Sequence, residues 1–352
     1  MPDTIQRLTV AQSASTPGSS PSFRPRRFLR NGHLQTIMGN YLRRINRLPA
    51  AVAQPVEVAP AREGQIASQV LCHCHFQPQE VRASCPTAII VHGLEGSSDS
   101  QYVIGNGNKL WNAGANIIRM NMRNCGGTEK LTPTLYHSGL SGDVDAVVRH
   151  FIAQEGLQSV SIVGYSMGGN LVLKLAGDLG TDAPPELKSV IAVSPALDLG
   201  PSADALHEPM NRVYEMKFLY ALLRRFRYKA TLFPDLYDPS MAEGVRSLRE
   251  FDDRVTAFYS DFASASDYYY RAAAARVVDR IQVPTLILHA LDDPFIRLTA
   301  ASRSRILTNP NITYIETQNG GHCAFLADPD ATANDDGYWA ESTLLRFLLE
   351  NA

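Results

Sequence analysis

Short apolar runs alternate with amphipathic segments along most of the chain. The runs with the composition of strands are residues 67–76, 87–93, 115–123, 159–164, 188–194, 284–290 and 313–316. The segments with helical spacing of apolar residues are 102–112, 141–154, 167–177 and 338–349. Strands that alternate with helices predict an α/β fold, with a mainly parallel central sheet covered by helices on both faces. The run 67–76 differs from the others and suits an exposed or antiparallel strand.

This alternation stops between about residues 200 and 280. The segment has helical patterns and many aromatic residues. One predicted helix has an apolar face made of Val213, Met216, Tyr220 and Leu223. We expect the segment to pack on the core as a helical lid over the carboxyl ends of the strands. We expect aromatic residues such as Phe258 and Tyr269 to line this lid and to set the preference for the length of the acyl chain.

Composition and charge exclude several classes of protein. The 352-residue chain is 45% hydrophobic and 19% charged, which allows a substantial core. Its formal net charge of -2 argues against a protein that mainly binds nucleic acid, because phosphate binding needs concentrated positive charge. The mixture of Lys, Arg and aromatic residues in the lid does not make nucleic-acid binding more plausible, since the rest of the chain has no excess of basic over acidic residues. No apolar run approaches the roughly 20 residues that span a bilayer.

The amino terminus indicates the compartment and the division of the chain. The first 22 residues lack the apolar core of a signal peptide and are rich in Ser, Thr, Pro, Ala and Gln, which predicts a disordered tail. Five cysteines, an odd number without an export signal, fit a reducing cytoplasm. We therefore expect a cytoplasmic protein with a tail at 1–22, an N-terminal arm at 23–66 and an α/β domain at 67–350.

One cluster of cysteines and histidines has residue types that bind metals. Cys72 and Cys74 alternate with His73 and His75, and zinc is the metal such residues favour. In a strand, however, this alternation sends the cysteines to one face and the histidines to the other. The sequence has no second cluster to complete a tetrahedral set. We therefore predict no metal site.

The strongest chemical signal lies where a predicted strand meets a predicted helix. Gly164, Ser166 and Gly168 form a G-x-S-x-G pattern between the strand at 159–164 and the helix that follows. A serine at such a sharp turn is held in a strained backbone conformation, and side chains two residues away would collide with the neighbouring strand and helix. A plain helix cap needs neither glycine. The pattern predicts that Ser166 is a nucleophile.

Three further features occur in the order that this chemistry requires. The turn His92-Gly93-Leu94 follows a buried strand, so the backbone N–H groups of Leu94 and Met167 are candidate oxyanion-hole donors. Asp292 and Asp293 follow the strand at 284–290, and either could be the acid of a catalytic triad. His322 lies between glycines and the final helix. The chain order Ser, Asp, His matches that of a serine hydrolase with a parallel sheet.

These residues predict acyl transfer in two steps on a small-molecule acyl ester. His322 removes the proton of Ser166, the donors hold the oxyanion, and water then releases the acid. The reaction needs no metal or organic cofactor.

Seven motifs together resemble one family. They are "NGHLQTI" at Asn31–Ile37, "RNCGGTE", "LYHSGLSGDV", "GYSMGGN", "FASASDYYYRA", "HALDDPF" and "GGHCAF". Over Phe23 to Leu349 the chain resembles α/β-hydrolases, and within them the YheT-like esterases and their eukaryotic abhydrolase relatives. The resemblance implies the α/β-hydrolase fold with a helical lid, and a serine carboxylesterase with the triad Ser166, Asp293 and His322. Its "DDPF" motif favours Asp293 over Asp292.

The resemblance leaves the substrate open. It implies short- or medium-chain acyl esters, with acylglycerols or phospholipids in some members. An acylglycerol lipase, a phospholipase, a thioesterase or a peptidase would use the same triad. A non-catalytic ligand-binding protein of this fold would be expected to lose a triad member, and none is missing here. The oligomeric state cannot be predicted from the sequence.

The N-terminal arm allows two interpretations. From Arg24 to Arg47 it carries seven arginines and no acidic residue. It could be a strap packed along the domain, with His33 and Gln35 hydrogen-bonded in place. It could also make a weak peripheral contact with anionic lipid, which a basic patch attracts.

Overall fold

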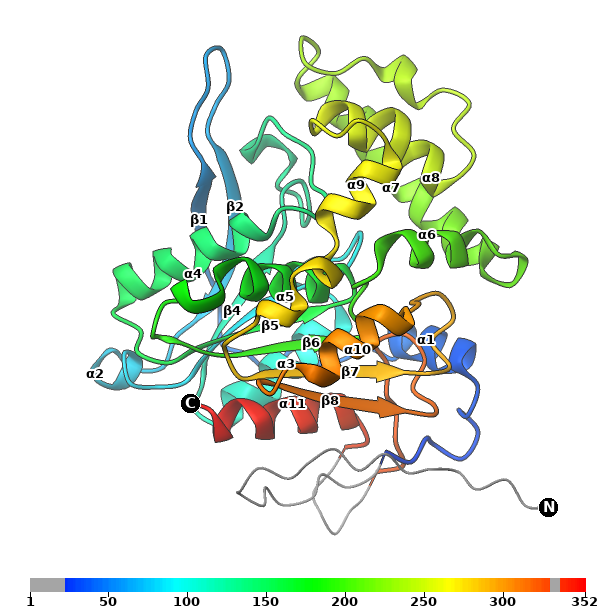
Figure 1. Ribbon diagram of the computed structural model, residues 1–352. Helices are drawn as coiled ribbons and strands as arrows, with labels where there is room; N and C mark the ends of the chain where they lie inside the picture. The colour runs from blue at the N-terminus through cyan, green and yellow to red at the C-terminus, as the bar shows by residue number, and fades with distance from the viewer. Residues whose placement is uncertain (1–22, 330–335) are drawn as a thin grey trace, which may run out of the picture.

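The computed structural model describes residues 23–329 and 336–352, so the tail predicted at 1–22 lies outside the described residues. They form one sheet in the order β1-β2-β4-β3-β5-β6-β7-β8 (Figure 1). The strands are β1 (Val52–Ala59), β2 (Ser68–His75), β3 (Thr87–Val91), β4 (Asn116–Asn121), β5 (Val160–Tyr165), β6 (Leu187–Val193), β7 (Thr285–Ala290) and β8 (Ile312–Thr317). β2 pairs antiparallel with β1 and β4, and all pairs from β4 to β8 are parallel. The mainly parallel sheet is therefore confirmed.

Helices cover both faces of this sheet, as the alternation predicted. The helices of the α/β domain are α2 (Gln79–Arg82), α3 (Gln101–Asn112), α4 (Ser141–Glu155), α5 (Met167–Leu179), α10 (Ala300–Thr308) and α11 (Trp339–Glu350). One apolar core joins the sheet to α4, α5 and α10, and a second joins the opposite face to α3 and α11. None of the helices among the described residues is long and apolar enough to cross a bilayer.

The insertion between β6 and β7 is helical, and Figure 1 shows it above one end of the sheet. Its main helices are α6 (Leu199–His207), α7 (Arg212–Leu232), α8 (Leu248–Phe251) and α9 (Ala265–Ala272). We call this segment the lid. The lid packs on the domain through its own apolar side chains and through Asn170, whose side chain bonds Ala272 and Ala274 of the lid.

The apolar face predicted from the sequence of α7 does not pack on the core. Val213 and Tyr220 are 79% and 68% exposed, Met216 is half-exposed, and Leu223 is only partly buried. The inward face consists of Glu215, Leu219, Leu222, Phe226 and Lys229. Two charged residues can be buried there because each has partners: Glu215 accepts from the Leu248 N–H, and Lys229 donates to the carbonyl oxygens of Glu129 and Thr132. Hydrophobic spacing does not reveal such partners.

The structure contains one strand that the sequence analysis did not predict. β1 lies within the arm and was not predicted, because it has an exposed edge and contains Pro55.

In β2, Cys72 and Cys74 enter the core beneath α4, while His73 bonds Ser98 and His75 bonds Arg119. The cysteines and histidines thus lie on opposite faces, as the alternation predicted. Among the described residues, no group of three or more metal-ligating side chains could hold an ion.

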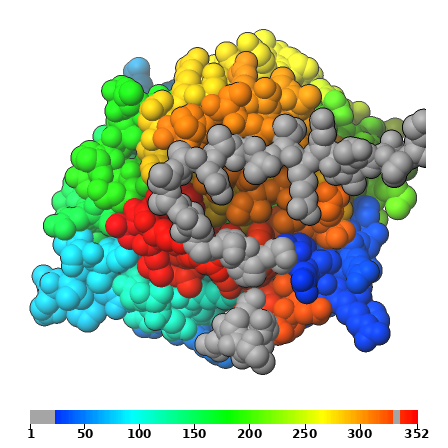
Figure 2. Space-filling view, turned by 60° about the horizontal axis from the view of Figure 1, so that its bottom comes forward, coloured from blue at the N-terminus to red at the C-terminus, as the bar shows by residue number. Residues whose placement is uncertain are grey.

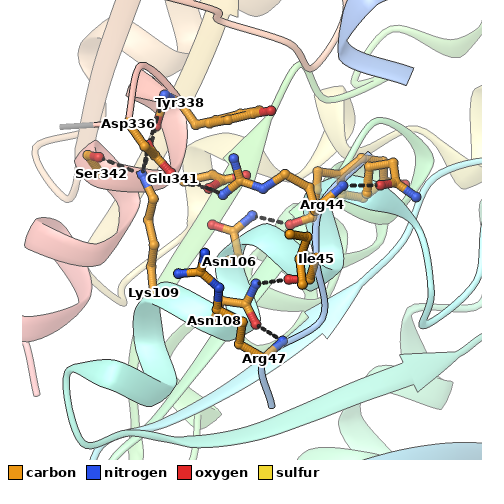
Figure 3. A network of polar contacts seen from close by, with 12 residues as sticks. Arg44, Ile45, Arg47, Asn106, Asn108, Lys109, Asp336, Tyr338, Glu341 and Ser342 are labelled. Carbon is orange, nitrogen blue, oxygen red and sulfur yellow. Dashed lines mark hydrogen bonds and ion pairs between the residues drawn. The ribbon is translucent and has the colours of Figure 1, made fainter. Parts of the chain in front are cut away.

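The arm is held to the domain by a network of charged side chains (Figure 3). Arg44 lies 2.6 Å from Glu341 and 3.3 Å from Asp336, and its guanidinium stacks 3.4 Å over the ring of Tyr338. Lys109 of α3 reaches the same aspartate at 2.7 Å. These contacts fix the chain just beyond α1 (Gly32–Tyr41) against α3 and α11. Figure 2 shows the arm, in blue, against the orange-red segment before residue 330.

Candidate active site

Ser166 occupies a sharp turn between β5 and α5. Its backbone has φ 55° and ψ -116°, a conformation that costs free energy for a residue with a Cβ. A Cβ on Gly164 would lie 2.2 Å from the Gly168 carbonyl oxygen, and one on Gly168 would lie 2.4 Å from that of Val91. The predicted need for both glycines is confirmed: the turn brings the start of α5 against the ends of β5 and β3.

The turn after β3 is fixed by a buried histidine. His92 Nε2 accepts the Met122 N–H at 3.1 Å, so the ring proton is on Nδ1, which donates to the Gly93 carbonyl at 2.8 Å. Burial lowers the pKa of His92 to about 4, which keeps the ring neutral. In a trans peptide the C=O and N–H point in opposite directions, so the Leu94 N–H faces away from His92. A Cβ on Gly93 would lie 3.1 Å from Ser166 Cβ, which places this turn directly against the serine.

The structure brings Asp293 and His322 together. Asp293 follows β7, its side chain is fully buried, and its Oδ2 lies 2.8 Å from His322 Nδ1. Its other oxygen accepts the N–H groups of Phe295 and Ile296. Burial would raise the pKa of Asp293, but the imidazole and these N–H groups lower it, so the group is a carboxylate. Burial would lower the pKa of His322, but Cys323 and Asp293 beside it raise that pKa.

Asp292 has a different set of partners. Its Oδ1 accepts the Gly321 N–H at 2.8 Å, and its Oδ2 accepts from the Asn319 side chain at 3.3 Å. The two adjacent aspartates therefore divide their contacts: Asp293 binds the imidazole of His322, and Asp292 binds the backbone of the loop that carries it.

The arm supports the same loop, a role that sequence reasoning missed. Thr36 Oγ1 accepts the His322 N–H at 2.8 Å, and Gln35 bonds both the N–H and the carbonyl of Leu326. Gly32 packs so closely that a Cβ there would lie 1.9 Å from the Asp292 carbonyl oxygen. The predicted hydrogen bonding of His33 and Gln35 is confirmed, and the "NGHLQTI" motif proves to hold the histidine loop.

Two cavities meet at Ser166. The inner cavity, about 120 Å³, lies under the lid and is mostly apolar. Its lining includes Leu135, Ala203, Leu206, Leu222, Phe226 and Tyr269. The outer pocket, about 660 Å³, is more polar. Its lining includes His33, Ile37, Tyr41, Val213, Lys217, Ala221 and His322. Ser166, Leu94, Phe218 and Phe295 line both.

The two aromatic residues expected to line the lid and set the acyl preference lie in different environments. Tyr269 lies in the wall of the inner cavity, but Phe258 is 64% exposed and lines neither cavity. The expectation for Phe258 is therefore wrong.

An ion pair ties the lid to the turn that carries Leu94. Arg225 of α7 binds Glu95 through two parallel hydrogen bonds of 2.9 and 3.0 Å, and it also reaches Glu129 at 2.8 Å. Tyr136 donates to the same Glu95 carboxylate at 2.5 Å. Because these groups are largely buried and bidentate, the contact holds the Leu94–Glu95 backbone against the lid.

Comparison with known proteins gives consistent matches. The sequence model of the alpha/beta hydrolase fold matches residues 86–329. The putative esterase YheT of Escherichia coli is 30% identical, with 94% of each chain covered. Phospholipase ABHD3 of Mus musculus is 29% identical over 68% of this chain and 58% of its own. Among solved structures, Est1E of Butyrivibrio proteoclasticus with ferulic acid bound superposes with a TM-score of 0.51 at 18% identity, covering 80% of this chain and 95% of that one.

Proposed function

Because the chain belongs to the α/β-hydrolase family and is a hydrolase of the esterase and lipase type, we propose that it cleaves carboxylic esters through an acyl-enzyme on Ser166. The observation that carries the proposal is the position of Ser166: a strained turn exposes it at the point where the two cavities meet, beside His322 in the outer pocket. A serine that only capped α5 would need neither the strain nor the cavities.

The proposed mechanism assigns each group one task. His322 takes the proton of Ser166 as the hydroxyl oxygen attacks the ester carbonyl, and Asp293 fixes the ring with its proton on Nδ1 and stabilises the imidazolium. The N–H groups of Leu94 and Met167 bind the oxyanion, where losing one donor costs about 3–4 kcal/mol. The histidine then protonates the departing alcohol, and water activated by the same ring releases the acid.

The positions of the two cavities support one orientation of the ester. The departing alcohol must lie beside His322, which protonates it, and His322 lines the outer pocket but not the inner cavity. The acyl chain therefore enters the inner cavity. An apolar cavity of roughly 150 Å³ holds benzene, so the inner cavity, at about 120 Å³, would accept only a short acyl chain. The proposed substrates are esters of short acyl chains with larger alcohols.

The same triad would serve an acylglycerol lipase, a phospholipase or a thioesterase, and relatives with such names are among the matches. The size of the outer pocket fits a glycerol-based alcohol as well as an aromatic one. A panel of p-nitrophenyl esters, short-chain acylglycerols, phospholipids and acyl thioesters separates these substrates.

A fluorophosphonate probe tests the nucleophile. The purified chain should become labelled, and Ser166→Ala should abolish both the labelling and the turnover of p-nitrophenyl acetate. Ser240→Ala, at an exposed serine of the lid, is the matched control and should keep both. Labelling that persists in Ser166→Ala would sink the assignment.

A further inference from the structure

The outward face of α7 combines apolar and basic side chains. Val213, Met216 and Tyr220 recur at helical spacing and are 79%, 50% and 68% exposed. Lys217, Arg224 and Arg227 lie on the same face and are exposed as well. The acidic residue of α7, Glu215, is buried on the opposite side. Exposed apolar side chains interleaved with Lys and Arg, and with no exposed acid on the helix, form a face that can contact both the acyl chains and the anionic headgroups of a lipid surface.

A second apolar face belongs to α1. Leu34, Ile37 and Tyr41 are spaced as one side of this helix and are 47%, 41% and 71% exposed. α1 contains no acidic residue. His33 and Tyr214 connect the two helices, with a 3.1 Å hydrogen bond and stacked rings. Figure 1 shows α1, in blue, beside the green segment that leads into α7. We call the exposed apolar residues of α1 and α7 the rim.

Part of the rim lines the outer pocket. Ile37 and Tyr41 from α1 line this pocket, and so do Met210, which is 75% exposed, and Val213. The pocket that holds Ser166 and His322 is therefore bordered by apolar side chains from two segments far apart in the sequence. Apolar residues gathered around a pocket entrance mark an interaction surface rather than scattered exposure.

The exposed charged side chains of α7 are all basic, although the whole chain has a net charge of -2, and the exposed acid before this helix, Glu208, is paired with Arg297 at 3.2 Å. The exposed cations of α7 lie on one side, and Arg30 and Arg43 flank α1 on the other. We propose that the rim docks on an anionic lipid surface, with its apolar side chains at the boundary of headgroups and acyl chains and its cations among the headgroups.

A second copy of the chain fits this face less well. A two-fold contact places the same patch on both partners, so the cations Lys217, Arg224 and Arg227 would be brought close to the same set of cations on the other copy and repel. On an anionic bilayer the same cations are attracted. If the proposed esterase function holds, docking also brings the outer pocket to the surface, so that an ester can enter from the bilayer without crossing water.

Vesicle co-sedimentation tests the docking. Full-length Ser166→Ala protein is mixed with phosphatidylcholine vesicles, with or without phosphatidylserine, so that binding does not depend on turnover. The protein should bind the anionic vesicles, and added salt should weaken this binding. Adding Leu34→Glu and Met216→Glu should lower the partition coefficient at least about tenfold, because two apolar contacts become anionic. Neither residue lines the inner cavity or the outer pocket.

The matched control carries Ile66→Glu and Leu307→Glu, two exposed apolar positions away from the rim that give the same change in charge. It should bind nearly as well as the parent. An equal loss of vesicle binding in both double variants would contradict docking through the rim. A parent protein that does not bind anionic vesicles would contradict it as well. If the rim variant instead abolished a dimer detected by light scattering, the face would be an interface between copies and the proposal would be overturned.

Assays with active Ser166 separate this proposal from the esterase function. The rim variant should hydrolyse p-nitrophenyl acetate in solution like the parent but lose activity on an ester presented in anionic vesicles. A parent that binds vesicles without cleaving any ester would refute the esterase function and leave docking intact. Cleavage of soluble ester without vesicle binding would refute the docking alone.

Discussion

The inner cavity and the outer pocket meet at one serine but are built from different parts of the chain. The inner cavity, about 120 Å³, is lined by the lid and by loops that follow strands of the sheet. The outer pocket, about 660 Å³, is lined by α1, the start of α7 and the loop of His322. Under the proposed function this difference makes recognition asymmetric: the small, mostly apolar cavity would limit the acyl chain, while the larger and more polar pocket would receive the alcohol.

The N-terminal arm connects the outer pocket with the loop that carries His322. The helix that lines the outer pocket also accepts the His322 N–H through Thr36 and binds the following loop through Gln35. The group proposed to protonate the alcohol and the wall proposed to contact it are thus positioned by the same segment. The inner cavity depends instead on the lid and on the Arg225–Glu95 contact.

The largest effect is expected from a change in the proposed triad, which would act on an ester bound in both the inner cavity and the outer pocket. Asp293→Asn keeps the shape of the residue but loses the carboxylate that fixes the ring of His322, so kcat should fall about 10⁴-fold for every ester. The pKa seen in the pH profile of the residual activity should also fall, because the carboxylate helps to raise the pKa of His322 above its ordinary value of 6.5. Steady-state kinetics across pH measure both effects.

Asp292→Asn is the neighbouring control for this prediction. It removes a carboxylate that binds loop backbone rather than the imidazole, so its loss of kcat should be far smaller. If Asp292→Asn proved the more damaging of the two, the assignment of the triad acid would be reversed.

An intermediate effect should come from the link between the lid and the Leu94 turn. Arg225→Met removes the bidentate pair with Glu95, so the proposed oxyanion donor, the Leu94 N–H, is held less rigidly and kcat should fall up to about 100-fold, with a smaller change in KM. Arg271→Met, which breaks an exposed ion pair with Asp267 elsewhere in the lid, should leave kcat near the parent value. A change confined to KM would show that Arg225 shapes binding rather than the oxyanion site.

The sequence predicted the parts of this site that local backbone chemistry dictates. The glycines beside Ser166 and the alternating faces of β2 follow from local geometry, and the structure agrees. The contact of Arg225 with Glu95 joins residues 130 positions apart, and no local pattern indicates it. The inward face of α7 was missed for the same reason: buried Glu215 and Lys229 depend on distant backbone partners, while apolar residues of that helix face outward.

The division of the ester between the two cavities is tested most directly by two alanines of the lid. Ala203 lines the inner cavity and Ala221 lines the outer pocket, and both are partly buried. Each is changed to leucine, and kcat/KM is measured by proton release for the acetate and hexanoate esters of methanol and 1-naphthol. Ala203→Leu should lower the preference for hexanoate over acetate about tenfold, whatever the alcohol. Ala221→Leu should lower the preference for naphthol over methanol by a similar factor, whatever the acid. Suppose instead that Ala203→Leu changed the alcohol preference and Ala221→Leu changed the acyl preference. The alcohol would then occupy the inner cavity and the acyl chain the outer pocket, which would contradict the account.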